Sequence, residues 1–141
     1  MMDVIFRFFY RIFFEHVSEL LPYEKLCLGA WRALLSAENK DILDRQIESC
    51  WTVRRYIGKL CFHHSKRENV PLFANFHPDQ NVALVVFEAL SSRVGTARIF
   101  IHRGLFFSIE NSRSLQKFIE SHKSNINQLK ISRIDILIDL N

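Results

Sequence analysis

The sequence contains little glycine, and its glycines are scattered. The four glycines lie at positions 29, 58, 95 and 104 and form no cluster. A phosphate-binding loop needs several glycines within a few residues, so no such loop is present. The chain also lacks a Gly-x-Ser-x-Gly nucleophile elbow and a His-Glu-x-x-His zinc motif. These absences exclude the enzyme classes that depend on those motifs.

Cysteine is scarce too, and its count is odd. Cys27, Cys50 and Cys61 show no paired spacing. A chain of 141 residues can bury a core without disulfide or metal staples. We therefore expect reduced thiols, no disulfide and a cytoplasmic location.

Strong charge of one sign is missing as well. Apolar residues make up 48% of the chain and charged residues 24%, which is typical of a folded protein, and we expect one domain over residues 1–141. The net charge of +4 is a mild basic excess that falls short of a dedicated nucleic-acid protein. Most of the 13 phenylalanines occupy core-facing positions. We do not expect nucleic acid as the partner, although a nucleic-acid-binding protein remains an alternative function.

Residues 1–21 are apolar but interrupted by charge. Asp3, Arg7, Arg11 and Glu15 recur every four residues, so no run reaches the length of a signal peptide or a membrane span. On a helical period these charges share one face, and phenylalanines cover most of the remainder. Three interpretations stay open: a nearly buried core helix, a helix that contacts a partner or a second copy in a homodimer, or a helix on a membrane surface. We favour the core helix and expect no membrane insertion.

Two more helices are predicted before the first strand. Pro22 suits the first position of a helix, because its missing N–H would be unpaired there anyway. The helix over 23–35 is predicted to bury one face, namely Tyr23, Leu26, Cys27, Ala30, Trp31, Leu34 and Leu35. Ser36 is the predicted N-cap of a helix over 37–50.

The helix over 37–50 carries an acidic stripe. Four carboxylates at spacings of three, three and four residues share one side, namely Glu38, Asp41, Asp44 and Glu48. The opposite side points toward the core and consists of Ile42, Leu43, Ile47 and Cys50. The stripe is either a solvated helix face or a docking surface for a basic partner.

From Trp51 onward the apolar pattern takes the two-residue period of strands. Strands are predicted over 54–64, 81–90, 96–103, 105–110 and 130–140. Pro71 would confine a further strand over 68–76 to an edge or an entry position. A helix over 112–125 is capped by Ser112 or Ser114. The predicted fold is α+β, with N-terminal helices packed on one face of a mostly antiparallel sheet of about five strands and one further short helix before the last strand.

His102, Arg103 and Gly104 join two of these strands. Because arginine tolerates positive φ poorly, we expect a three-residue loop, with His102 and Arg103 in a type I turn and Gly104 in a left-handed bulge position. This loop would place Ile101 opposite Leu105. We interpret the triplet as turn chemistry rather than a catalytic centre.

The combination closest to a metal site is Cys61, His63 and His64. Adjacent histidines on a strand point apart, so a four-ligand zinc site would have to borrow distant groups such as His77 or Cys50. We therefore expect no metal. No other set of residues fits a recognisable catalytic motif, so we expect no cofactor and no catalytic residue, with a small enzyme of unknown class as an alternative.

Two stretches carry a resemblance to known proteins. The sequence LLSAENKDILDRQIES and, later, HRGLFFSIENSR are similar to a group of small bacterial α+β proteins with a Leu-Asp-Arg-Gln helix and a Gly-x-Leu-Phe-Ser-Ile-Glu hairpin. The match covers roughly residues 30 to 115 and has Phe106 where leucine is expected. In this chain the motif positions are Leu43, Asp44, Arg45 and Gln46, followed by Gly104, Phe107, Ser108, Ile109 and Glu110.

The chain also resembles the immunity proteins of contact-dependent growth inhibition systems in its size, its α+β build and its lack of a catalytic motif. That resemblance implies a cytoplasmic protein that binds and neutralises a cognate toxin domain. Charge suggests two candidate docking patches. One is the acidic stripe Glu38, Asp41, Asp44 and Glu48, and the other is the hairpin group Arg98, His102 and Arg103.

Overall fold

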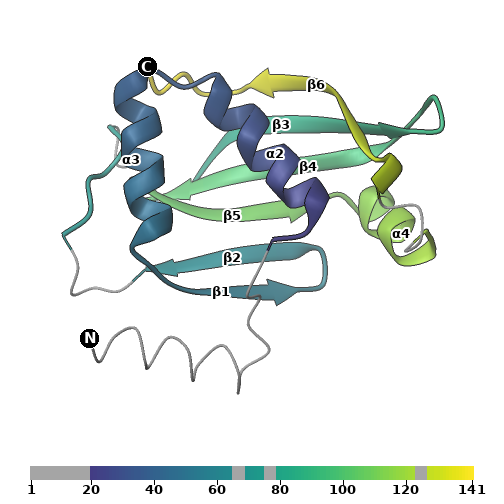
Figure 1. The fold of residues 1–141 in the computed structure, drawn as a ribbon, viewed down its shortest axis with the longest axis horizontal. Coiled ribbons are helices and arrows are strands. Elements are labelled where there is room, and N and C mark those ends of the chain that lie inside the picture. Colours follow the sequence, from purple (N-terminus) through teal and green to yellow (C-terminus); the bar gives the residue numbers. More distant parts are fainter. Residues whose placement is uncertain (1–19, 65–68, 75–78, 123–126) are drawn as a thin grey trace.

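The computed structural model describes residues 20–64, 69–74, 79–122 and 127–141 and has the α+β fold that the sequence predicts (Figure 1). In chain order the elements are α2 (Pro22–Ala33), α3 (Ala37–Glu48), β1 (Cys50–Tyr56), β2 (Lys59–His64), β3 (Gln80–Ala89), β4 (Ser92–His102), β5 (Leu105–Asn111), α4 (Arg113–Ser121) and β6 (Lys130–Ile136). The predicted first helix lies outside the described residues. Among the residues that are described, no helix is long and apolar enough to cross a membrane.

All neighbouring strands of the six-stranded sheet are antiparallel, in the order β1-β2-β5-β4-β3-β6. Figure 1 shows α2 and α3 crossing one face of the sheet. α4 packs on the same face, because its Leu115 lies over Gly95, which is paired with the core residue Phe87. The described helices therefore share one face, and the opposite face carries none of them.

The helix starts follow their sequence signals. Pro22 is the first residue of α2. The Ser36 hydroxyl accepts a hydrogen bond from the Asn39 N–H at 3.2 Å, and the Ser112 hydroxyl accepts one from the Leu115 N–H at 3.2 Å. Both serines satisfy N–H groups that have no partner within the helix. The predicted caps at Ser36 and Ser112 are confirmed.

The buried face of α2 is shifted from the predicted one. Tyr23, Cys27 and Trp31 are buried as predicted. Glu24 and Leu28, which the predicted face omits, are buried beside them. Leu26 and Leu34 lie outside this face and remain 47% exposed each. The Trp31 ring stacks on Phe106 at a centroid distance of 6.0 Å and makes that ring part of the core.

Residues 54–64, predicted as one strand, belong to two. β1 and β2 form a hairpin in which Tyr56 pairs with Lys59, and Gly58 closes the turn with φ of +72°. A turn this short barely interrupts the alternation of apolar and polar residues, so the pattern alone conceals it. The sheet consequently has six strands rather than about five.

The hairpin at Gly104 is confirmed, but its loop is shorter than predicted. Gly104 has φ of +80° and Arg103 has φ of +49°, and His102 pairs with Leu105. The turn therefore has two residues in left-handed conformations, and Arg103 adopts one despite its side chain. The predicted register was wrong for two reasons. The two-residue turn places Ile101 opposite Phe106 instead of Leu105, and a bulge in β5 then makes Phe100 with Ser108 the next pair.

The stretch 68–76, for which strand and loop were both open, forms no strand in its described part. Residues 69–74 carry no strand, yet Phe73 is fully buried. The Phe73 N–H donates to the Gly104 carbonyl at 3.0 Å, so this segment is fastened to the β4–β5 turn.

Gln46, on the buried side of α3, forms hydrogen bonds to both the segment at Pro71 and the β4–β5 hairpin. Its Nε2 donates to the carbonyls of Pro71 and Gly104 at 2.8 and 2.9 Å, and its Oε1 accepts from the Phe106 N–H at 2.7 Å. The side chain is fully buried. One amide thus satisfies backbone groups from two segments that the helix must cover.

We predict that Gln46→Ala lowers the free energy of unfolding by about 2–4 kcal/mol. The change leaves the Phe106 N–H and the Pro71 carbonyl buried without this partner, and each such group costs about 1–3 kcal/mol. Urea denaturation followed by circular dichroism measures the loss. Lys117→Ala, on the exposed side of α4, is the control and should stay within about 0.5 kcal/mol. A loss below about 1 kcal/mol for Gln46→Ala would contradict the assignment.

Position 95 requires glycine because Leu115 of α4 lies very close to the backbone there. A Cβ added at Gly95 would lie 2.5 Å from the backbone nitrogen and 2.6 Å from the Cβ of Leu115. The start of α4 therefore rests directly on β4 at this point. Gly29, in α2, has nothing within 4 Å of such a Cβ.

We predict opposite outcomes for alanine at these two glycines. Gly95→Ala should destabilise the protein by about 1–3 kcal/mol, because α4 must move away from β4. Gly29→Ala should stabilise it by up to about 1 kcal/mol, because alanine favours the helix and meets no neighbour. Thermal unfolding of both variants tests the pair, and equal effects at the two positions would argue against the close contact.

Candidate functional site

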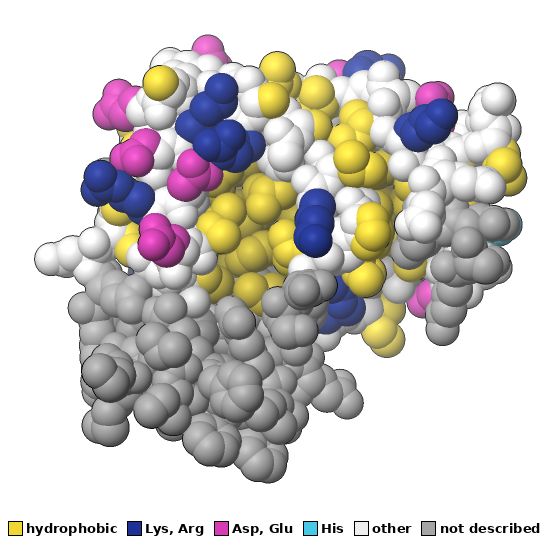
Figure 2. All heavy atoms as spheres, in the orientation of Figure 1, with side chains coloured by type: hydrophobic (Ala, Val, Ile, Leu, Met, Phe, Trp, Pro, Cys, Tyr) yellow, Lys and Arg dark blue, Asp and Glu magenta, His cyan; other side chains and the backbone are white. Residues whose placement is uncertain are grey.

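Two of the four carboxylates in the acidic stripe on α3 are paired with the protein's own arginines. Asp44 accepts two hydrogen bonds from Arg32, at 2.8 and 2.7 Å, and these bonds lower the pKa of Asp44. Asp41 forms an ion pair with Arg45 at 3.1 Å. Figure 2 shows acidic and basic side chains intermixed over α3 and the adjoining part of α2. Glu38 and Glu48 are exposed and complete the stripe.

On the face opposite the described helices, charged residues from different strands stand side by side. Arg98 on β4 is opposite Glu110 on β5, Glu110 is opposite Lys59 on β2, and Lys59 is opposite Tyr56 on β1. Charge alternates along this row. Directly opposed residues of antiparallel strands lie close enough to interact, so the row forms one continuous polar surface.

Glu110 is held in place by its neighbours. The Lys59 Nζ lies 3.8 Å from its Oε1, and the buried Ser108 hydroxyl donates to its Oε2 at 3.1 Å. Lys59 also lies 5.4 Å from the centre of the Phe107 ring, within the range of a cation–π contact. These contacts position a lysine, a carboxylate and an aromatic ring without burying them.

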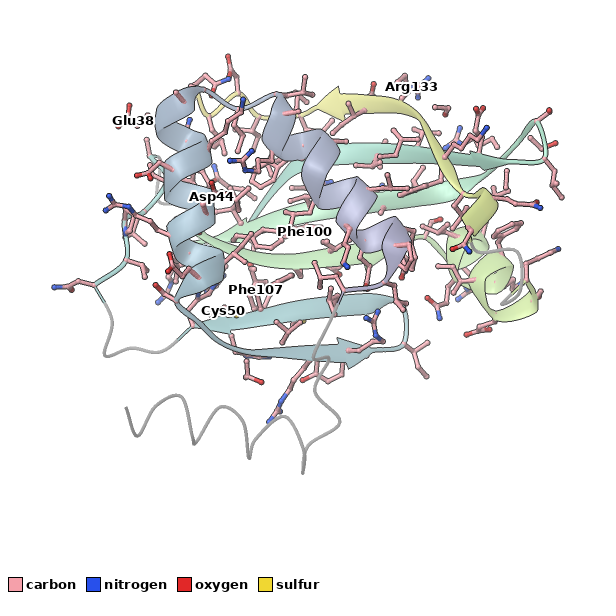
Figure 3. The ribbon with its side chains drawn as sticks, viewed as in Figure 1. Glu38, Asp44, Cys50, Phe100, Phe107 and Arg133 are labelled. Carbon is pink, nitrogen blue, oxygen red and sulfur yellow. The ribbon has the colours of Figure 1, made fainter. Side chains whose placement is uncertain are left out.

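Two phenylalanines and a histidine extend this surface. Phe100 and Phe107, labelled in Figure 3, are each half-buried. The His102 ring lies 5.5 Å from the Phe107 ring, and its Nδ1 is 2.8 Å from the Asp79 carboxylate. We call the six residues of this surface the sheet-face cluster, namely Lys59, Arg98, Phe100, His102, Phe107 and Glu110.

A shallow hollow of about 270 Å³ lies in the sheet-face cluster and is lined by Thr96, Arg98, Phe100, Glu110, Asn111 and Ser112. Arg98 is exposed beside it. Across the described ranges, no hydrogen bond or ion pair engages the Arg98 guanidinium. The surface therefore presents a cation with donors available to a ligand.

The structure brings together two of the three residues in the predicted hairpin patch. Arg98 and His102 lie on one face of β4, whereas Arg103 is exposed in the turn. Sequence analysis missed Lys59, Phe107 and Glu110 as their neighbours. The bulge in β5 and the turn at Gly58 decide these positions, and neither leaves a clear mark in the apolar pattern.

Two of the groups considered for a metal site make other contacts. His64 Nε2 lies 2.7 Å from the Phe106 carbonyl, and Cys50 Sγ lies 3.3 Å from the Thr52 carbonyl. Within the described parts of the chain, no three His, Cys, Asp or Glu side chains are grouped so that they could hold a metal ion. Position 77 lies outside those parts.

A partly buried ion pair lies between α2 and β1. The Glu24 carboxylate is 1% exposed and accepts from both terminal nitrogens of Arg55 and from the Leu21 N–H at 2.7 Å. Beside it, the Tyr23 hydroxyl accepts a hydrogen bond from Asn111 at 2.9 Å. With its charge paired and its oxygens bonded, Glu24 anchors α2 to β1.

Comparisons with protein-family models, with curated proteins and with solved structures find no match for this chain. The fold and the surface define an α+β protein whose antiparallel sheet carries helices on one face and an aromatic and charged surface on the other.

Two of the buried cysteine thiols have a raised pKa. Burial, with the nearby Glu24 charge, raises the pKa of Cys27 to about 12, and burial also raises the pKa of Cys61. We predict that native protein at about pH 8 reacts with iodoacetamide at Cys27 far more slowly than urea-unfolded protein, because only the thiolate reacts. Mass spectrometry of the alkylated protein measures the difference.

The raised pKa of Cys27 also determines how the stability of the folded protein changes with pH. Because the pKa of Cys27 is higher in the folded state, its contribution to stability is present below the unfolded value of about 8.5 and declines above it. Equal alkylation rates in native and unfolded protein would contradict the buried thiol.

Proposed function

We propose that this chain is a non-catalytic binding protein that recognises a partner protein through the sheet-face cluster. The partner is a bacterial toxin domain, which the chain neutralises in the cytoplasm as an immunity protein. Binding of this kind needs no cofactor and no catalytic group. The resemblance of the helix and hairpin motifs to small bacterial α+β proteins supports the bacterial setting.

One observation carries the proposal. The sheet-face cluster combines two half-buried aromatic rings with an exposed arginine, a lysine and a carboxylate on a surface without a described helix. Aromatic residues and arginine are the types most enriched where protein interfaces concentrate their binding energy. Because the strands fix the spacing of these side chains, little conformational entropy is lost when a partner binds.

The acidic stripe on α3 is the weaker candidate. Asp41 and Asp44 are already paired with Arg45 and Arg32, so a basic partner would have to compete with these arginines. Arg98, by contrast, has its donors available beside the hollow. The toxin domain therefore presents an acidic side chain to Arg98 and an apolar group to Phe100 and Phe107, since interfaces match charge with opposite charge.

We predict that Arg98→Glu and Phe107→Ala each weaken binding of the toxin domain by roughly 30-fold, which corresponds to about 2 kcal/mol. In the experiment, the chain is co-expressed with the candidate toxin domain, which is the C-terminal domain encoded by the gene upstream, and protection of growth is scored. Calorimetric titration of the purified pair gives the dissociation constant.

Asp41→Lys together with Glu48→Lys forms the matched control, because it alters charge on α3 and leaves the sheet intact. We expect less than about threefold change in affinity for that variant. If the α3 variant loses protection and the Arg98 and Phe107 variants do not, the interface lies on the acidic stripe and not on the sheet-face cluster. If wild-type protein forms no complex and gives no protection, the immunity function is refuted.

A further inference from the structure

β6 forms one edge of the sheet. It pairs with β3 on one side, and it is the last strand in the order β1-β2-β5-β4-β3-β6. An edge strand directs half of its backbone N–H and C=O groups away from the sheet, where they can pair with another strand. Arg133, labelled in Figure 3, lies on this strand.

The side chains of β6 alternate between the two faces. Arg133 is opposite Val86 and Asp135 is opposite Leu84, so both charges lie on the face that bears the sheet-face cluster. Ile134 is opposite Val85 and points toward the helices. Arg133 and Asp135 form an exposed ion pair with each other at 3.1 Å, with side chains 61% and 39% exposed.

We propose that two copies of the chain associate through their β6 strands, which pair antiparallel about a two-fold axis at Ile134. The two six-stranded sheets then join into one continuous sheet with the helices of both copies on the same side. Such an interface is closed, because each copy contributes the same strand.

Charge selects this register. With the axis at Ile134, Arg133 of each copy stands opposite Asp135 of the other, and the two-fold axis makes this favourable pair twice. With the axis at Arg133 or at Asp135, two like charges face each other instead. Cross-strand pairs of opposite charge stabilise a sheet and pairs of like charge destabilise it, so the sequence of β6 favours one pairing over its neighbours.

Exposed apolar side chains border the same edge. Ile136 and Leu137 are 43% and 50% exposed, and Leu34 at the end of α2 is 47% exposed. Leu34 and Ile136 line a hollow of about 320 Å³ on the helix side of β6. A second copy at this edge covers part of this apolar surface, which adds a hydrophobic contribution to the strand pairing.

The proposed β6 dimer is independent of the proposed toxin complex. The sheet-face cluster lies on β2, β4 and β5, and β3 separates these strands from β6. A failed dimer would leave the proposed function intact, and a failed toxin complex would leave the dimer intact.

The test is analytical ultracentrifugation of the full chain from about 1 μM to about 500 μM. Wild-type protein should sediment as a monomer–dimer equilibrium. Asp135→Arg and Arg133→Asp should each weaken dimerisation roughly tenfold or more, because each turns two favourable pairs into two repulsive ones. The double variant Arg133→Asp with Asp135→Arg restores opposite charges across the axis and should recover the dimer.

Lys117→Glu, on the exposed surface of α4, is the control and should dimerise as wild type does. Circular dichroism confirms that each variant is folded. A wild-type protein that stays monomeric over the whole range overturns the proposal. So does a double variant that dimerises no better than the single variants, because the attraction would then not arise from the Arg133–Asp135 pairs.

Discussion

The hydrogen bonds of Gln46 hold the architecture together. One buried amide joins α3 to the β4–β5 turn and to the segment at Pro71, through contacts of 2.7–2.9 Å. Without it, α3 would cover backbone groups that have lost their partner, and each such group costs about 1–3 kcal/mol. Gln46 belongs to the Leu-Asp-Arg-Gln motif, and Gly104 begins the hairpin motif. The hydrogen bond between these two residues brings the two motifs into direct contact.

The same turn adjoins the sheet-face cluster. Gln46 and Phe73 both donate hydrogen bonds to the Gly104 carbonyl, the turn at Gly104 has two residues, and β5 accommodates an extra residue as a bulge. The bulge leaves Phe106 in the core against Trp31 and turns Phe107 toward Lys59 and His102. A buried contact on the helix side thereby sets the aromatic surface on the opposite side.

Local signals in the sequence predicted the fold class and the helix starts well. Pro22, Ser36 and Ser112 act through their own backbone geometry, which needs no tertiary information. The bulge in β5 and the positive φ of Arg103 depend on tertiary contacts, so the pattern of apolar residues could not reveal them. For the candidate site, the sequence indicated Arg98 and His102 but not Lys59, whose strand it merged with β1.

The central claim is that the partner binds the sheet face and not α3. Amide NMR spectra of the labelled chain, recorded with and without the proposed toxin partner, test it directly. The account predicts that binding shifts the signals of β2, β4 and β5 around Lys59, Arg98 and Phe107 and leaves those of Ala37–Glu48 nearly unchanged. Shifts concentrated in α3, with the strands unaffected, would contradict it.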